Sequence, residues 1–215
     1  MHSISPLWLM TGAVALLALL VFERLEARFA IAAAKLTAST CFVGLALSLD
    51  VHSTQTGQLF LGGLLLCWLG DALLLSRGMS MSFQLGIGAF LLGHVAYAAA
   101  FYRWGIDGLS FALAAVAILL LGLPILRWLR PHVPAEFRLA VISYVIVIGF
   151  MVACAIGAAR HSAPALAAAG ALLFAASDLS VARERFVSPG FINSLWGLPA
   201  YYVAQVAIVL SLQAI

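Results

Sequence analysis

The sequence predicts an all-α fold, a polytopic integral membrane helical bundle with eight transmembrane helices. Its 215 residues are 65% hydrophobic and only 9% charged, with a mean hydropathy of +1.12, whereas soluble domains carry about 25% charged residues. The apolar runs reach the length of about 20 residues that a bilayer core of about 30 Å requires. They are continuous Leu, Ala, Val and Ile without regular polar alternation. These features exclude soluble α/β enzymes, disordered chains and outer-membrane barrels.

Charged residues, Gly and Pro interrupt the apolar runs and predict where each helix ends. The first run leads into the charged stretch ERLEAR, which is no cleavage site, so we expect this helix to remain in the mature protein. The longest connection, near residues 129–137, is too short for a separate domain. We therefore expect a single transmembrane domain over residues 1–215, with helices over 6–22, 29–49, 58–75, 82–101, 109–128, 138–158, 163–181 and 191–212.

Arginines in the connections predict the orientation of the helices. The first, third, fifth and seventh connections hold eight of them, whereas the opposite side holds Arg103 and Arg160. Because short cytoplasmic loops are enriched in basic residues, we expect these odd connections to be cytoplasmic and both termini extracytoplasmic, in a bacterial inner membrane. The eight are Arg24, Arg28, Arg77, Arg127, Arg130, Arg138, Arg183 and Arg185.

Scattered charges and cysteines argue against a nucleic-acid surface, disulfide bonds and a metal site. The net charge of +3 comes from single basic residues between apolar segments, so no nucleic-acid surface is expected. Cys41, Cys67 and Cys154 lie inside apolar runs without paired spacing, which argues against disulfides and a zinc ribbon. Only one histidine falls deep in a span, so a metal site is not expected either.

Four ionisable residues lie inside the apolar spans, namely Lys35, Asp71, His94 and Asp178. A charge at the centre of a membrane helix costs about 2.5–3.5 kcal/mol on insertion scales, which makes each a candidate functional residue. Lys35 and the two aspartates lie close to the expected cytoplasmic helix ends, within one layer roughly 5–10 Å below the interface. His94 lies deeper, at the level of three polar residues of the last helix, Tyr201, Tyr202 and Gln205.

A weak internal repeat relates the two halves of the chain. LLLCWLGDALLLSR around Asp71 is similar to LLFAASDLSVARER around Asp178, and the same offset of 107 residues carries His94 onto Tyr201. Two parallel four-helix units would place the aspartates opposite each other across a pseudo-twofold axis. Chance similarity is the alternative, since Leu and Ala are so frequent.

Small residues predict close helix packing around His94. The fourth expected helix carries Gly86, Gly93, His94 and Tyr97 on one face, and the seventh is rich in Ala and Gly around Gly170. Such compositions are typical of membrane helices that approach closely, so His94 should face the bundle.

Structural roles for these polar residues remain alternatives. Each aspartate could bind a neighbouring helix or reach interface water, and Lys35 could extend its ammonium to the interface. His94 could be a hydrogen-bonded core histidine. Three tyrosines could be packing aromatics whose hydroxyls find partners, namely Tyr144, Tyr201 and Tyr202.

Four motifs in order resemble the YhhN-like lysoplasmalogenase family of small eight-helix membrane proteins. They are LLLCWLGDALLL with Asp71, FQLGIGAFLLGHVAYAAAF with His94, GALLFAASDLSVARERF with Asp178, and LPAYYVAQ with Tyr201. The resemblance extends from Lys35 to Gln205, although the family pattern has Lys-Pro where this chain has Lys35-Leu36. It implies hydrolysis of the vinyl ether bond of lysoplasmalogens, which releases a fatty aldehyde and glycerophosphoethanolamine or glycerophosphocholine.

The implied chemistry suits two aspartates. Protonation of a vinyl ether at its β-carbon gives an oxocarbenium ion that water traps, so the reaction needs a protonated carboxylic acid beside a carboxylate, as in glycosidases. We expect Asp71 and Asp178 to form this acid/base pair, either one being the acid, without a redox or metal cofactor. The remaining candidate residues would orient water or the lysophospholipid: Lys35, His94, Tyr144, Tyr201, Tyr202 and Gln205.

Two other functions remain open from the sequence. Intramembrane carboxylates and a repeat also describe proton-coupled transporters of small molecules or lipids. A non-catalytic partner protein embedded among membrane lipids is the third reading. Release of aldehyde in detergent, where no compartment exists, separates an enzyme from a transporter.

Overall fold

Eight long apolar helices make up nearly all of the computed structural model, which describes residues 6–76 and 78–214. This confirms the predicted fold class. All helix ends lie within three residues of the expected positions, and Arg77 lies outside the described residues. The helices are α1 (Pro6–Arg24), α2 (Arg28–Ser48), α3 (Gln55–Leu73), α4 (Met81–Trp104), α5 (Gly108–Leu129), α6 (Arg138–His161), α7 (Ala165–Ala182) and α8 (Phe191–Ser211).

Short helical turns, which the sequence did not predict, fill several connections. The turns η1 (Val51–Ser53) and η2 (Ala135–Phe137) precede α3 and α6, and η4 (Leu212–Ala214) follows α8. A π-helical turn, η3 (Arg183–Val187), continues α7. Asp178 therefore lies farther from the end of the helical segment than the predicted helix end at residue 181 suggested.

Side-chain caps begin three helices. The Thr54, Ser80 and Asp107 side chains accept hydrogen bonds from the first-turn N–H groups of α3, α4 and α5, at 3.0, 3.2 and 2.8 Å. Such caps satisfy backbone donors that the helix itself leaves unpaired. Hydrogen bonds from Ser110 hold the pKa of the Asp107 carboxyl below its usual value.

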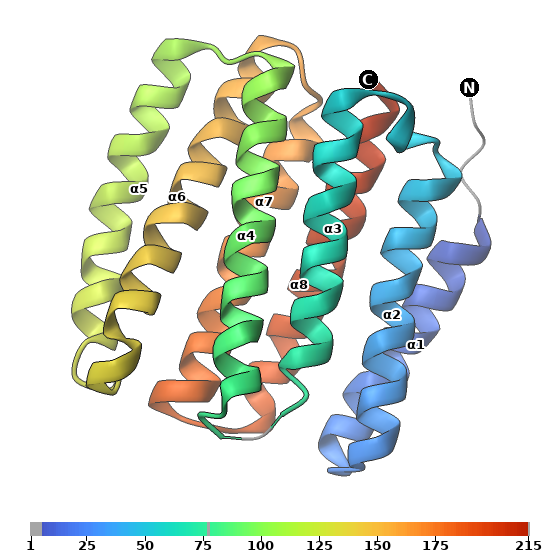
Figure 1. Cartoon of the computed structure of the whole chain (residues 1–215), viewed down its shortest axis with the longest axis vertical. Helices are drawn as coiled ribbons and strands as arrows, with labels where there is room; N and C mark the ends of the chain where they lie inside the picture. The colour runs from blue at the N-terminus through green and yellow to red at the C-terminus, as the bar shows by residue number, and fades with distance from the viewer. Residues whose placement is uncertain (1–5, 77, 215) are drawn as a thin grey trace.

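Six helices pack in a closed ring, in the order α2, α3, α4, α6, α7 and α8. The remaining two lie outside it, with α1 against α2 and α8, and α5 against α6 at the opposite edge of the molecule (Figure 1). These outer helices are the least buried of the eight. The polar residues discussed below come from the ring.

Equivalent contacts in the two halves support the parallel repeat. Each half begins with an outer helix packed on the next, and α3 packs on α4 as α7 packs on α8. Gly63 lies against the ring of Tyr97, and the residues 107 positions later, Gly170 and Ala204, are also in close contact. A side chain at either glycine would collide with the neighbouring helix. The offset of 107 residues between the two halves therefore relates pairs of residues that are in contact in both halves.

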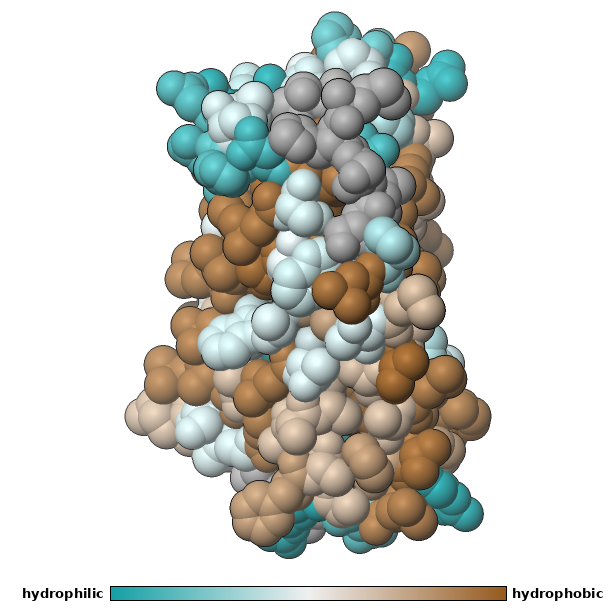
Figure 2. Space-filling model, turned by 90° about the vertical axis from the view of Figure 1, so that its right-hand side faces the viewer, coloured by the Kyte–Doolittle hydropathy of each residue, from teal (hydrophilic) through white to brown (hydrophobic). Residues whose placement is uncertain are grey.

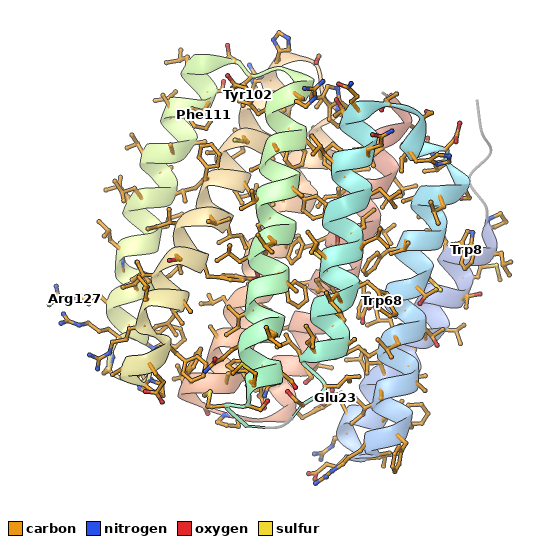
Figure 3. All side chains as sticks on the ribbon, in the orientation of Figure 1. Trp8, Glu23, Trp68, Tyr102, Phe111 and Arg127 are labelled. Atoms are coloured by element: carbon orange, nitrogen blue, oxygen red, sulfur yellow. The ribbon has the colours of Figure 1, made fainter. Side chains whose placement is uncertain are left out.

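An apolar belt lies between two polar ends on one face of the molecule. Figure 2 shows hydrophilic residues gathered at the top and bottom of one face, with hydrophobic residues between them. The odd connections lie at the lower end in Figure 1, whereas α1 begins and α8 ends at the upper end. In Figure 3, Arg127 points away from the bundle near the lower end. Length, composition and this belt describe a multi-pass membrane protein.

Candidate active site

A buried ion pair between α2 and α3 forms one half of the candidate site. Lys35 Nζ lies 3.3 Å from Asp71 Oδ1, and the two side chains are 14% and 3% exposed. Lys35 is seven residues from the first residue of α2, and Asp71 is two from the last residue of α3. Because these helices are antiparallel neighbours, both groups lie near the same end of the bundle, as the sequence predicted.

Two hydroxyls donate to the other oxygen of the Asp71 carboxylate. Ser39 Oγ lies 2.6 Å and Tyr201 Oη 2.8 Å from Asp71 Oδ2. Hydrogen bonds to an ionised acceptor are stronger than those between neutral groups. With Lys35 on one oxygen and two donors on the other, the surroundings of Asp71 suit an ionised carboxylate.

Polar residues of α8 extend this half of the site into the bundle. Tyr202 Oη donates to the Lys35 carbonyl at 3.1 Å and lies 3.2 Å from Ser39 Oγ. Gln205 links two further hydroxyls: its Nε2 donates to Tyr201 at 3.3 Å, and its Oε1 accepts from Tyr97 at 2.8 Å. Gln205 and Tyr97 are fully buried. Such a hydrogen-bonded network fixes the orientation of Tyr201 toward Asp71.

Asp178 forms the second half of the site with α4 and α6. Tyr144 Oη donates to Asp178 Oδ2 at 2.8 Å, and His94 Nε2 lies 3.5 Å from the same oxygen. His94 is fully buried, its ring packs against Phe174 at 4.6 Å between centroids, and neither ring nitrogen has a well-formed hydrogen bond among the described residues. No described lysine or arginine pairs with Asp178. Its surroundings suit a neutral carboxylic acid better than those of Asp71 do.

The repeat relates the two halves of the site. Asp71 of α3 contacts Tyr201 of α8, and the positions offset by 107 are Asp178 of α7 and His94 of α4, which also contact each other. Side chains from α2 complete the first half, and Tyr144 of α6 completes the second. The same framework therefore presents one carboxylate to a cation and the other to aromatic residues.

Both aspartates line one large cavity. Its volume is about 1240 Å³, and its walls are mostly apolar side chains of α4 to α8. Ligand pockets for drug-sized molecules measure about 300–1,000 Å³, so this cavity has room for a larger amphiphile. Lys35, Asp71, Tyr144, Asp178 and Tyr201 line it, whereas three of the predicted residues lie behind this wall, namely His94, Tyr202 and Gln205.

The lower end of the cavity is crossed by Arg185 of the π-helical turn. Its guanidinium donates to the Leu74 carbonyl at 2.9 Å and lies over the ring of Phe83, 4.7 Å from the centroid. Through these contacts Arg185 joins the connection after α7 to the connection after α3. Arg28 also lines this end, and its side chain forms no ion pair or hydrogen bond with the described residues.

The structure brings all eight predicted residues into two adjoining clusters around Asp71 and Asp178. Sequence reasoning missed Ser39 as a partner of Asp71 and Tyr97 as a partner of Gln205. Ser39 follows Lys35 by four residues and so lies on the same face of α2, a signal that could have identified it. Nothing in the local sequence indicated that Arg185 reaches across the cavity.

Comparison with known proteins identifies relatives of this chain. Lysoplasmalogenase TMEM86A of Bos taurus is 34% identical over 155 residues, and that of Homo sapiens is 32% identical over 155 residues. Each match covers 69% of this chain and 62% of the relative, so the matched region spans less than two thirds of the relatives' length. No solved structure matches. The YhhN family model matches residues 30–212, most of the chain, and the protein therefore belongs to the YhhN family.

Proposed function

We propose that this protein is a membrane-embedded hydrolase that cleaves the vinyl ether bond of lysoplasmalogens. The products are a fatty aldehyde and glycerophosphoethanolamine or glycerophosphocholine. The relatives named lysoplasmalogenase support this reaction class. The observation that carries the proposal is the pair of aspartates on one cavity, one paired with Lys35 and the other without a lysine or arginine partner among the described residues.

The first step is proton transfer from the Asp178 carboxylic acid to the β-carbon of the vinyl ether. A group without a cationic counter-ion in apolar surroundings retains its proton near neutral pH. The double bond supplies the electron pair for the new C–H bond, and the adjacent ether oxygen shares the positive charge. The result is an oxocarbenium ion and an Asp178 carboxylate.

Asp71 acts on the cation and on the water that attacks it. Its carboxylate stabilises the positive charge and accepts a proton as water adds to the carbon bonded to oxygen. This separation of acid and carboxylate parallels the pair in glycosidases. The resulting hemiacetal breaks its C–O bond: its hydroxyl loses a proton as the aldehyde forms, and the glycerol oxygen gains one. The proton that Asp71 took from water passes to Asp178, which restores the carboxylate and the acid.

Neighbouring groups position these two carboxyl groups. Ser39 and Tyr201 hold one oxygen of Asp71, and Lys35 holds the other, so the carboxylate has a fixed orientation. Tyr144 does the same for Asp178. His94 closes the site behind Asp178 and orients its carboxyl group. Groups held in this way lose little freedom when the transition state forms.

The same proposal includes the placement of the protein in the membrane. Arginines concentrate at the end of the bundle where Asp71, Lys35 and Arg185 line the cavity. By the positive-inside rule that end faces the cytoplasm, and both termini are extracytoplasmic. A bacterial inner membrane is the expected location.

Purified protein in detergent micelles tests the reaction directly. We expect release of aldehyde from a lysoplasmalogen and none from the saturated alkyl ether analogue, which cannot form the oxocarbenium ion by protonation. A transporter would release no aldehyde in micelles and would move the unchanged lipid in proteoliposomes. That pair of results would replace the hydrolase proposal.

Asparagine variants test the roles of the two carboxyl groups. Asp71→Asn and Asp178→Asn should each lower turnover by at least about 100-fold, the usual loss when a general acid or base is removed. Asp50→Asn is the matched control, because Asp50 lies in the connection after α2 at the opposite end of the bundle. Near wild-type turnover in a folded Asp71 or Asp178 variant would remove that residue from the mechanism.

A further inference from the structure

The two outer helices differ in a way that the repeat does not predict. Helix α1 packs on α2 and also on α8, and the Arg24 guanidinium lies 5.7 Å from the centre of the Phe191 ring at the start of α8. Its counterpart α5 packs on α6 but makes no extensive contact with α4, the counterpart of α8. The space between α1 and α8 is therefore closed, whereas the equivalent space between α5 and α4 is open.

The cavity lies in this open position. Phe83, Ile87 and Phe90 of α4 line one side, and Ile118, Leu121 and Gly122 of α5 line the other. Leu121 lines the cavity and is nevertheless 67% exposed, so the cavity is open at this residue. The cavity wall thus reaches the lipid-facing surface between α4 and α5. In Figure 1 these helices meet at the upper connection and separate toward the lower end.

The cavity also carries charged side chains, although most of its lining is apolar. Arg185 crosses its lower end between the connections after α3 and α7, so the opening of the cavity toward water at that end is narrower. Lys35, Asp71 and Asp178 line the cavity as well. A molecule that fills the whole cavity must therefore have a charged or polar end and an aliphatic end, which is the chemistry of a single-chain amphiphile.

We propose that the gap between α4 and α5 is the binding site for the alkyl chain of a single-chain amphiphile that enters sideways from the bilayer. The chain lies along the wall formed by α5 and α6, and the polar end points toward Asp71 and Asp178. The identity of this amphiphile as a lysoplasmalogen rests on the proposed function. The binding site itself rests on the open position of α5.

Gly122 controls the length of chain that this site accepts. A Cβ atom placed on Gly122 would lie 3.6 Å from Val145 Cγ1 of α6, an ordinary contact, so an alanine fits there. A phenylalanine would project into the cavity. Gly122 lies seven residues before Leu129, the last residue of α5, or about 10 Å along the helix. A ring at this depth excludes the methylenes that lie beyond it.

Equilibrium binding of saturated alkyl ether lysophospholipids tests the site without turnover. For Gly122→Phe we expect at least about tenfold weaker binding of a long-chain analogue, since excluding about two buried methylenes already has that effect. Binding of a short-chain analogue should be unchanged. Leu120→Phe is the matched control, because Leu120 lies on the same helix, is 65% exposed and does not line the cavity; it should bind both analogues as wild type does.

The measured affinities support or overturn the proposed chain-binding site. Wild-type affinity of folded Gly122→Phe for the long-chain analogue would overturn it, as would absence of binding to the wild-type protein. Where Gly122→Phe fails to fold, Ile125→Phe on the same cavity wall carries the same test. A wild-type protein that binds the ether analogues in this pattern but releases no aldehyde from a vinyl ether would refute the hydrolase proposal and leave the chain site standing.

Discussion

Replacing Lys35 with methionine should destabilise the fold through Asp71. Unit charges 3.3 Å apart attract by about 5 kcal/mol at an effective dielectric constant of about 20. Removing one partner of a buried pair costs about 3–5 kcal/mol, because the other charge stays buried. Ser39 and Tyr201 still donate to Asp71 and reduce the penalty, so we expect about 3 kcal/mol for Lys35→Met.

A double-mutant cycle isolates this interaction. In an Asp71→Asn background, Lys35→Met removes an unpaired buried charge and should cost less than about 1 kcal/mol, which gives a coupling of about 2–3 kcal/mol. Unfolding by sodium dodecyl sulfate in mixed micelles measures the four proteins. Arg28→Met is the control, since Arg28 lines the cavity without an ion pair to the described residues, and its effect should stay within about 0.5 kcal/mol.

The size of the coupling energy tests whether Lys35 and Asp71 form a specific ion pair. A coupling below about 0.5 kcal/mol would mean that Lys35 and Asp71 behave as independent residues. The assignment of Asp71 as the ionised partner would then be wrong, because that assignment depends on the ammonium group of Lys35. An effect of Arg28→Met as large as that of Lys35→Met would equally refute a specific pair.

Ser39→Ala should lower unfolding free energy by about 1.5–3 kcal/mol, the value of a hydrogen bond to a charged group; a loss below 0.5 kcal/mol, measured as above, would indicate that water replaces the hydroxyl. Turnover should fall on both sides of a pH optimum, because acid protonates the Asp71 carboxylate and alkali deprotonates the Asp178 acid. A turnover that only rises with pH, without an optimum, would exclude this acid/base pair. Chelators should leave turnover unchanged, since the spans carry one deep histidine and no cysteine cluster; inhibition that a divalent ion reverses would make the aspartates metal ligands. A reporter fused to the C-terminus should be active only outside the cytoplasm, and cytoplasmic activity would invert the proposed orientation.

The sequence by itself determined the eight helices and the layer that holds the charged residues. Bilayer thickness fixes helix length, so apolar runs of about 20 residues specify spans with little help from packing. Distance along a helix also fixes depth, at about 1.5 Å per residue. The sequence therefore places Lys35 and Asp71 in one layer, and the structure places them in contact at 3.3 Å. The offset of 107 residues between the two halves of the sequence likewise indicated that His94 corresponds to Tyr201.

Only the tertiary structure decided which groups in that layer touch. Depth leaves the rotation and neighbours of each helix undetermined, because nearly every face of these helices is apolar and membrane packing depends on close fit between surfaces. The partners of Asp71 and Asp178 differ for this reason, with Lys35 and Ser39 at one and Tyr144 and His94 at the other. The open side at α5 likewise depends on how the outer helices lean against the ring, which no local residue pattern specifies.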